Sequence, residues 1–90
     1  MTMIRRLVLD VLKPLEPSSI ELAKKLSVVK GVEAVDITVR EVDRKVETVR
    51  VTLEGEWLDI DKIEASLERY GAVVHSIDRV TAGNRTIDTG

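Results

Sequence analysis

Residues 32–54 read VEAVDITVREVDRKVETVRVTLE, and apolar and polar side chains alternate in two runs of this stretch. The first run covers residues 32–42 and the second covers residues 46–54. A period of two places successive side chains on opposite faces of a strand, so each run predicts a strand with one buried face. The polar residues 43–45, DRK, separate the runs, and such a short connection predicts a β-hairpin.

The two faces of this predicted hairpin differ in polarity. The side chains expected to face the core are Val35, Ile37, Val39, Val49, Val51 and Leu53. The side chains of the opposite face are Asp36, Thr38, Arg40, Thr48, Arg50, Thr52 and Glu54. An antiparallel sheet with one apolar and one polar face typically packs other elements against the apolar face only.

A third strand is predicted near the start of the chain, over residues 4–12. These residues are mostly Val, Ile and Leu, and a proline that cannot donate a backbone hydrogen bond follows them. Apart from Arg6 and Asp10 the strand is apolar on both faces, which is typical of a central strand. Val8 and Leu12 are expected on the same face as Asp10, because they lie two residues from it on either side.

Two helices are predicted, one before the hairpin and one after it. Ser18 and Glu21 form a capping-box pair that predicts the start of the first helix, which is expected to run to about residue 30, before a glycine. The second helix is expected to begin near Asp59, an N-cap residue, and to end at the next glycine. Residues 72–80 then predict the last strand.

This order of elements predicts an α+β fold, the ferredoxin-like βαββαβ sandwich. The fold has a four-stranded antiparallel sheet in the spatial order 4-1-3-2, with two helices on one face. We expect a single domain over residues 1–84 and a flexible C-terminal tail over residues 85–90. Because the helices cover only one face, Val8 and Leu12 need another surface to bury them, which predicts self-association into a homo-oligomer.

The composition argues against several classes of protein. The chain has 90 residues, of which 14 are basic and 16 acidic, and it has no cysteine, which excludes disulfides and thiolate metal sites. The predicted central strands contain no aromatic residue on which RNA bases could stack, and no block of charge predicts a nucleic-acid partner. No apolar stretch approaches the roughly 20 residues that span a membrane. We therefore expect a cytoplasmic protein with neither a nucleic acid nor a membrane as partner.

Asp10 and His75 are two candidate metal ligands. A carboxylate in the middle of a central strand is costly to bury unless it is paired or coordinated. If His75 points to the same face, antiparallel pairing brings its imidazole near Asp10, and the two groups together suit a divalent cation. The alternatives are an ion pair of Asp10 with Arg6, Arg40 or Arg50, and a structural histidine held by hydrogen bonds.

Asp36 and Asp78 are the other two candidate metal ligands. Asp36 belongs to an acidic group on the hairpin, and carboxylate oxygens suit calcium or magnesium, most readily between subunits. The alternative for this group is an ordinary solvated surface with salt bridges, because arginines lie among the acidic residues. Asp78 lies in the last strand, three residues after the histidine.

Several short segments carry a family resemblance. They are IRRLVLDVLKP at residues 4–14, VDITV at residues 35–39, LEG at residues 53–55 and HSID at residues 75–78. With these segments the chain resembles an archaeal family called domain of unknown function 211. The resemblance implies a ferredoxin-like fold, an archaeal cytoplasmic source and ring-like homo-oligomers that can bind a divalent metal. It implies no assigned activity and no catalytic residues.

These observations lead to three hypotheses of function. The first is a non-enzymatic homo-oligomeric binding module whose assembly depends on a divalent cation, calcium or magnesium, at Asp10, Asp36 and Asp78. The second is a regulatory domain that senses a small ligand, such as an amino acid, at a subunit interface. The third is a small enzyme in which His75 acts as general base and Asp10 or Asp78 orients it. The chain has no recognised catalytic or cofactor motif, which favours the first hypothesis.

Overall fold

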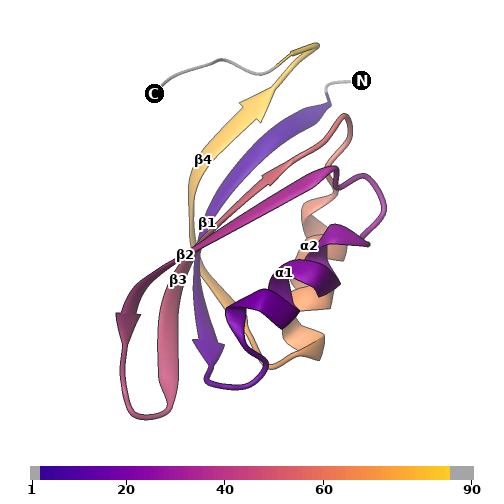
Figure 1. Cartoon of the computed structure of the whole chain (residues 1–90). Helices are drawn as coiled ribbons and strands as arrows, with labels where there is room; N and C mark the ends of the chain where they lie inside the picture. The colour runs from indigo at the N-terminus through magenta and orange to yellow at the C-terminus, as the bar shows by residue number, and fades with distance from the viewer. Residues whose placement is uncertain (1–2, 86–90) are drawn as a thin grey trace.

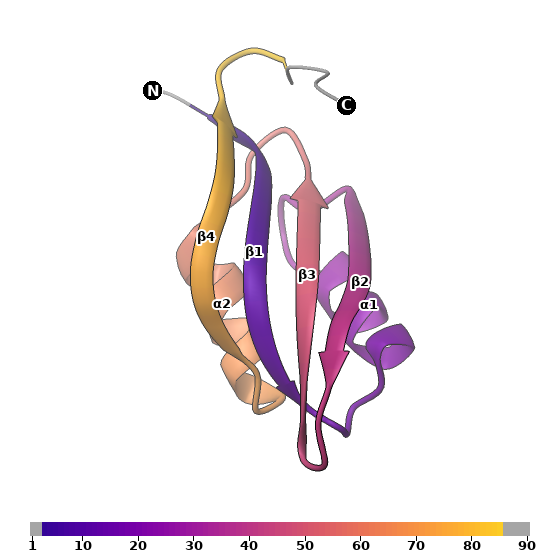
Figure 2. The ribbon, with the colours of Figure 1, turned by 90° about the vertical axis from the view of Figure 1, so that its left-hand side faces the viewer.

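The computed structural model describes residues 3–85, which form a four-stranded sheet and two helices (Figure 1). The elements, in chain order, are β1 (Ile4–Pro14), α1 (Ser19–Ser27), β2 (Ala34–Val42), β3 (Val46–Glu54), α2 (Ile60–Arg69) and β4 (Val73–Ala82). The sheet is antiparallel with the order β2-β3-β1-β4, which is the predicted 4-1-3-2 order counted from the other edge. Both helices cover one face (Figure 1), and Figure 2 shows the opposite face toward the viewer, with the helices behind the sheet. The predicted ferredoxin-like fold is confirmed.

The core lies between the sheet and the helices. It is aliphatic, and its fully buried members from β1, β3 and the two helices are Leu9, Val11, Val49, Val51, Leu53, Leu22, Leu26, Ile63 and Leu67. In β1 and β3 the buried residues alternate with more exposed ones, as the period of two predicts. In the register of β1 and β3, buried residues lie opposite one another, so both strands turn their buried side chains to the face that the helices cover. The pairs are Leu7 with Leu53, Leu9 with Val51 and Val11 with Val49.

The helix starts were predicted correctly, and one helix end was not. Ser18 Oγ accepts a hydrogen bond from the Glu21 amide at 3.2 Å, and Asp59 caps α2 by accepting hydrogen bonds from two amides. The first helix ends at Ser27 rather than near residue 30. The two residues that follow, Val28 and Val29, are β-branched and favour helix less than the preceding residues do.

Gly31 lies beyond that helix end and has a separate role. Its φ is +94°, and a Cβ added there would lie 2.0 Å from the carbonyl oxygen of Trp57. The turn after α1 and the loop between β3 and α2 therefore touch backbone to backbone. Only glycine allows both this φ and this approach.

Lys13 is buried at the end of β1, although lysine is normally exposed. Its ammonium group donates hydrogen bonds to the carbonyl oxygens of Pro14 at 2.7 Å and Pro17 at 2.6 Å, and it pairs with Glu47 Oε1 at 3.0 Å. The ammonium group thus joins the loop after β1 to strand β3. The sequence had suggested only that a strand ends here.

Two other expectations concern the flexible C-terminal tail and the absence of a membrane-spanning segment. Of the predicted tail, residues 86–90 lie outside the described residues. Within residues 3–85, no helix is long and apolar enough to cross a membrane.

Candidate functional site on the open sheet face

The sheet face opposite the helices, which is turned toward the viewer in Figure 2, is called the open face below. The register places a row of polar residues across its four strands. In register, Ser76 of β4, Asp10 of β1, Arg50 of β3 and Thr38 of β2 lie side by side. A shallow hollow of about 290 Å³ lies over this row, and we call it the open-face hollow. Its lining residues are Asp10, Arg40, Glu41, Thr48, Arg50, Ser76 and Asp78.

Asp10 and Asp78, two of the four predicted metal ligands, both line this hollow. Asp78 is the extra residue of a bulge in β4, because Arg79 pairs with Val8 while Ile77 pairs with Leu9. A bulge redirects a side chain relative to the regular strand. The Ser76 hydroxyl donates a hydrogen bond of 2.7 Å to Asp78 Oδ1, which helps to fix this carboxylate.

His75, the third predicted ligand, is not among the residues that line the hollow. It is the extra residue of a second bulge, because Ser76 pairs with Asp10 while Val74 pairs with Val11. Ser76 therefore takes the place opposite Asp10 that His75 was expected to take only if it pointed to the open face. His75 is exposed on the edge strand.

Asp36, the fourth predicted ligand, lies apart from the other three. It is exposed on β2, the other edge strand, and pairs with Thr52. It lines a separate hollow of about 200 Å³ that also includes Glu54, and Glu54 forms a salt bridge of 2.7 Å with Arg6. Over the described part of the chain, no three His, Asp or Glu side chains are grouped so that they could hold a metal ion.

The open-face hollow combines charges of both signs. Asp10, Glu41 and Asp78 are acidic, whereas Arg40 and Arg50 are basic. Asp10 is opposite Arg50 in register, but the two do not form a salt bridge. Among residues 3–85, the salt bridges join Arg6 to Glu54 and Lys13 to Glu47. Carboxylates that face guanidinium groups across a hollow can bind a cation, or both charged ends of a zwitterion. From the sequence, the two arginines were expected only as partners for acidic residues.

Comparison with known proteins identifies the family. A family model described as an uncharacterized ArCR family, domain of unknown function 211, matches residues 5–90. The chain belongs to this family. A relative is the uncharacterized protein MJ0319 of Methanocaldococcus jannaschii, which is 47% identical over 85 residues, or 94% of this chain and 88% of the relative. The resemblance found in the sequence is thus confirmed, and neither description assigns an activity.

In this member of the domain of unknown function 211 family, the open face also has an apolar part near the hairpin turn. Leu12 and Val73 pair in register and are 38% and 56% exposed, and Val46 beside Pro14 is 39% exposed. We call Leu12, Val46 and Val73 the apolar patch. The open face thus has a charged region and an apolar region, and no helix covers either of them.

Proposed function

We propose that this member of the domain of unknown function 211 family is a cytoplasmic, non-enzymatic binding module that forms homo-oligomers through its open face. The observation that carries the proposal is the apolar patch, because Leu12 and Val73 lie on hydrogen-bonded neighbouring strands and are exposed to water. Burying such contiguous apolar side chains against a second copy of the chain is favourable.

The open face suits a ring better than extension of the sheet from edge to edge. Strand β4 is one edge of the sheet, and its bulges at His75 and Asp78 disturb the regular pairing that an added strand would need. A contact between the apolar patch of one subunit and a different surface of the next is heterologous, and such contacts close into a ring when the rotation permits.

A divalent cation, calcium or magnesium, is proposed to link the subunits. Asp10 and Asp78 supply carboxylate oxygens at the open-face hollow. Calcium takes 6–8 oxygen ligands, so a neighbouring subunit would need to add others. Asp36 and His75 are exposed on opposite edge strands, where a neighbour can reach them.

The test is the molar mass from light scattering, after chelation and again with calcium, magnesium, manganese or zinc added singly. We expect one cation to increase the mass or to raise the melting temperature of the assembly. Asp10→Asn and Asp78→Asn should remove this response. Asp61→Asn, which makes the same change on α2 away from the open face, should keep it. A mass and a melting temperature that no cation changes would contradict the metal linkage.

A second candidate function, the sensing of an amino acid, is supported by the mixed charges of the hollow. The ammonium group of an amino acid would face Asp10 and Asp78, and its carboxylate would face Arg50. In the same melting experiment, a shift with amino acids but with no metal, removed by Arg50→Gln, would favour this function. A small enzyme based on His75 is a weaker proposal, because this histidine does not line the hollow with the two carboxylates.

A further inference from the structure

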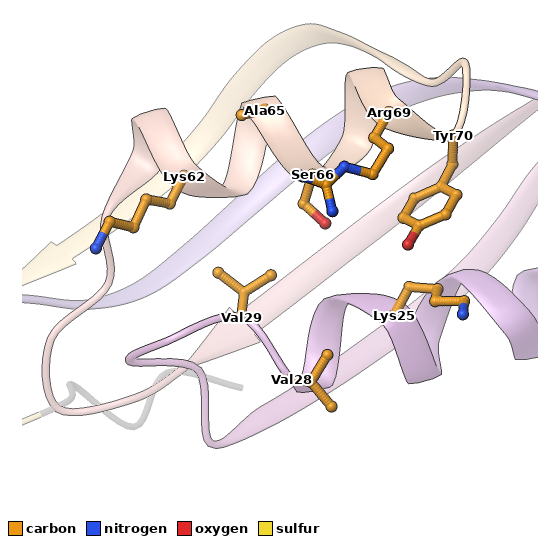
Figure 3. Close-up of a pocket in the computed structure, with 8 residues that line it drawn as sticks. All are labelled: Lys25, Val28, Val29, Lys62, Ala65, Ser66, Arg69 and Tyr70. Carbon is orange, nitrogen blue, oxygen red and sulfur yellow. The ribbon is translucent and has the colours of Figure 1, made fainter.

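A third hollow lies on the other side of the molecule, between the two helices. It has a volume of about 350 Å³, and its walls come from α1, from the turn after it, and from α2. Figure 3 shows Ser66 and Arg69 of α2 and the following Tyr70 on one side of this space, and Lys25 of α1 and Val29 of the turn after it on the other. We call it the interhelical groove. It shares no residue with the open-face hollow.

The groove is positively charged. Among the described residues that line it, three are basic and none is acidic, although the whole chain has a net charge of −2. The basic residues are Lys25, Lys62 and Arg69. No salt bridge between described residues neutralises any of them, because the ion pairs of the structure involve other side chains.

The sequence of α2 explains how this charge collects. Lys62, Ser66 and Arg69 are spaced by four and three residues, so they share one flank of the helix. The acidic residues of α2 occupy other positions and do not line the groove. They are Asp61, Glu64 and Glu68. The helix therefore turns a basic flank toward α1.

An aromatic ring and apolar side chains complete the groove. Lys25 Nζ lies 5.9 Å from the centre of the Tyr70 ring, which lines the groove, whereas Lys62 Nζ lies 5.8 Å from the centre of the Trp57 ring, which lies outside it. Val29 and the aromatic ring of Tyr70 give the hollow an apolar surface beside its cations. Small-molecule sites commonly combine apolar walls with a few polar groups in this way.

From this arrangement we infer that the interhelical groove binds a small organic phosphate monoester that carries an apolar or aromatic group. Guanidinium, ammonium and hydroxyl donors match the oxygens of a doubly charged phosphate, and arginine can bind two of them at once. The apolar part of the ligand would lie against Val29 and Tyr70. A long polyanion such as RNA fits less well, because the adjoining flank of α2 is acidic and would repel its other phosphates.

The test is calorimetric titration of the full chain with phenyl phosphate at physiological salt, compared with inorganic phosphate and with phenol. We expect phenyl phosphate to bind more tightly than either of its parts. Arg69→Gln and Lys25→Gln should each raise its Kd about tenfold or more, because each removes a charge-assisted hydrogen bond. Lys24→Gln is the matched control, since it removes the same charge from α1 at an exposed position outside the groove. It should leave the Kd within about twofold, because an exposed charge at a distance is largely screened.

Three outcomes would overturn the inference. They are no binding of phenyl phosphate at millimolar concentration, an equal loss of affinity in Lys24→Gln and Arg69→Gln, and phenol binding as tightly as phenyl phosphate. Tighter binding of a single-stranded oligonucleotide would instead assign the groove to nucleic acid. The groove shares no residue with the open-face hollow, and the titration measures ligand affinity rather than molar mass, so its failure can be told apart from a failure of the assembly proposed above.

Discussion

Lys13 carries a full charge in a position from which water is excluded, so its partners decide whether it stabilises the fold. A buried ammonium group is tolerated only when it is paired and hydrogen-bonded. Lys13 meets this condition through two proline carbonyl oxygens and Glu47, which lie on both sides of the β1 end. The side chain therefore acts as a cross-link between the loop of residues 14–17 and strand β3.

Replacing this lysine by Lys13→Met should lower the free energy of unfolding by about 3 kcal/mol, because the carbonyl oxygens and the Glu47 carboxylate lose their donor. The measurement is urea unfolding at a fixed protein concentration. Lys45→Met in the exposed hairpin turn is the control and should change stability by less than about 0.5 kcal/mol. If the Lys13→Met protein is as stable as the unmodified protein, the hydrogen bonds and the ion pair of Lys13 make no net contribution to the free energy of unfolding.

The candidate ligands show how far single residues could be placed from sequence. The regular alternation of β1 correctly assigns Asp10 to the open face, and the structure brings Asp78 to the same hollow. The position of His75 could not be predicted, because a bulge in β4 displaces it by one residue relative to a regular register. Asp36 and Asp10 lie on the same face of the sheet, but on strands that β3 separates.

At the scale of elements, the turn after α1 and the loop before α2 are held together at two glycines. A Cβ on Gly31 would lie 2.0 Å from the Trp57 carbonyl oxygen, and one on Gly55 would lie 2.0 Å from the Gly31 carbonyl oxygen. This contact fixes how the chain leaves the first helix and enters the second. Trp57 lies in the same loop, and Lys30 and Lys62 each place their ammonium group 5.8 Å from the centre of its ring.

Gly31→Ala should destabilise the protein by at least about 2 kcal/mol, because the new methyl group both clashes with a backbone carbonyl and opposes a positive φ. Gly83→Ala separates the two causes, since Gly83 has a φ of +126° but nothing within 4 Å of an added Cβ. Its cost should be about 1 kcal/mol, from the backbone conformation alone. Urea unfolding of the two variants checks this, and equal costs would contradict the role given to the close approach.

At the scale of the whole molecule, the surface has two sides, and a different binding role is proposed for each. The interhelical groove lies on one side, and the open face with its charged hollow and apolar patch lies on the other. Among the described residues, the open face has exposed apolar side chains on neighbouring hydrogen-bonded strands, Leu12 of β1 and Val73 of β4. We therefore expect the open face to determine the oligomeric state.

Leu12→Lys should reduce the molar mass in light scattering toward that of one chain, 10.0 kDa, because it places a charge in the apolar patch. Ile20→Lys makes the same kind of change on α1, where Ile20 is 70% exposed and lies away from the open face. This control should keep the mass of the unmodified protein. Far-UV circular dichroism must show that both variants are folded. If the two variants have the same mass, the subunit contact lies elsewhere.

The sequence by itself determined the order of the elements, the buried faces of β1 and β3, and the starts of both helices. These features depend on residues that are close in the chain: a period of two, a capping side chain or a proline. Tertiary structure decided the burial of Lys13, the residue opposite Asp10, and the groove that collects Lys25 with Arg69. The reason is physical, because each depends on the register of a bulged strand or on the packing of segments far apart in the chain, which local patterns do not encode.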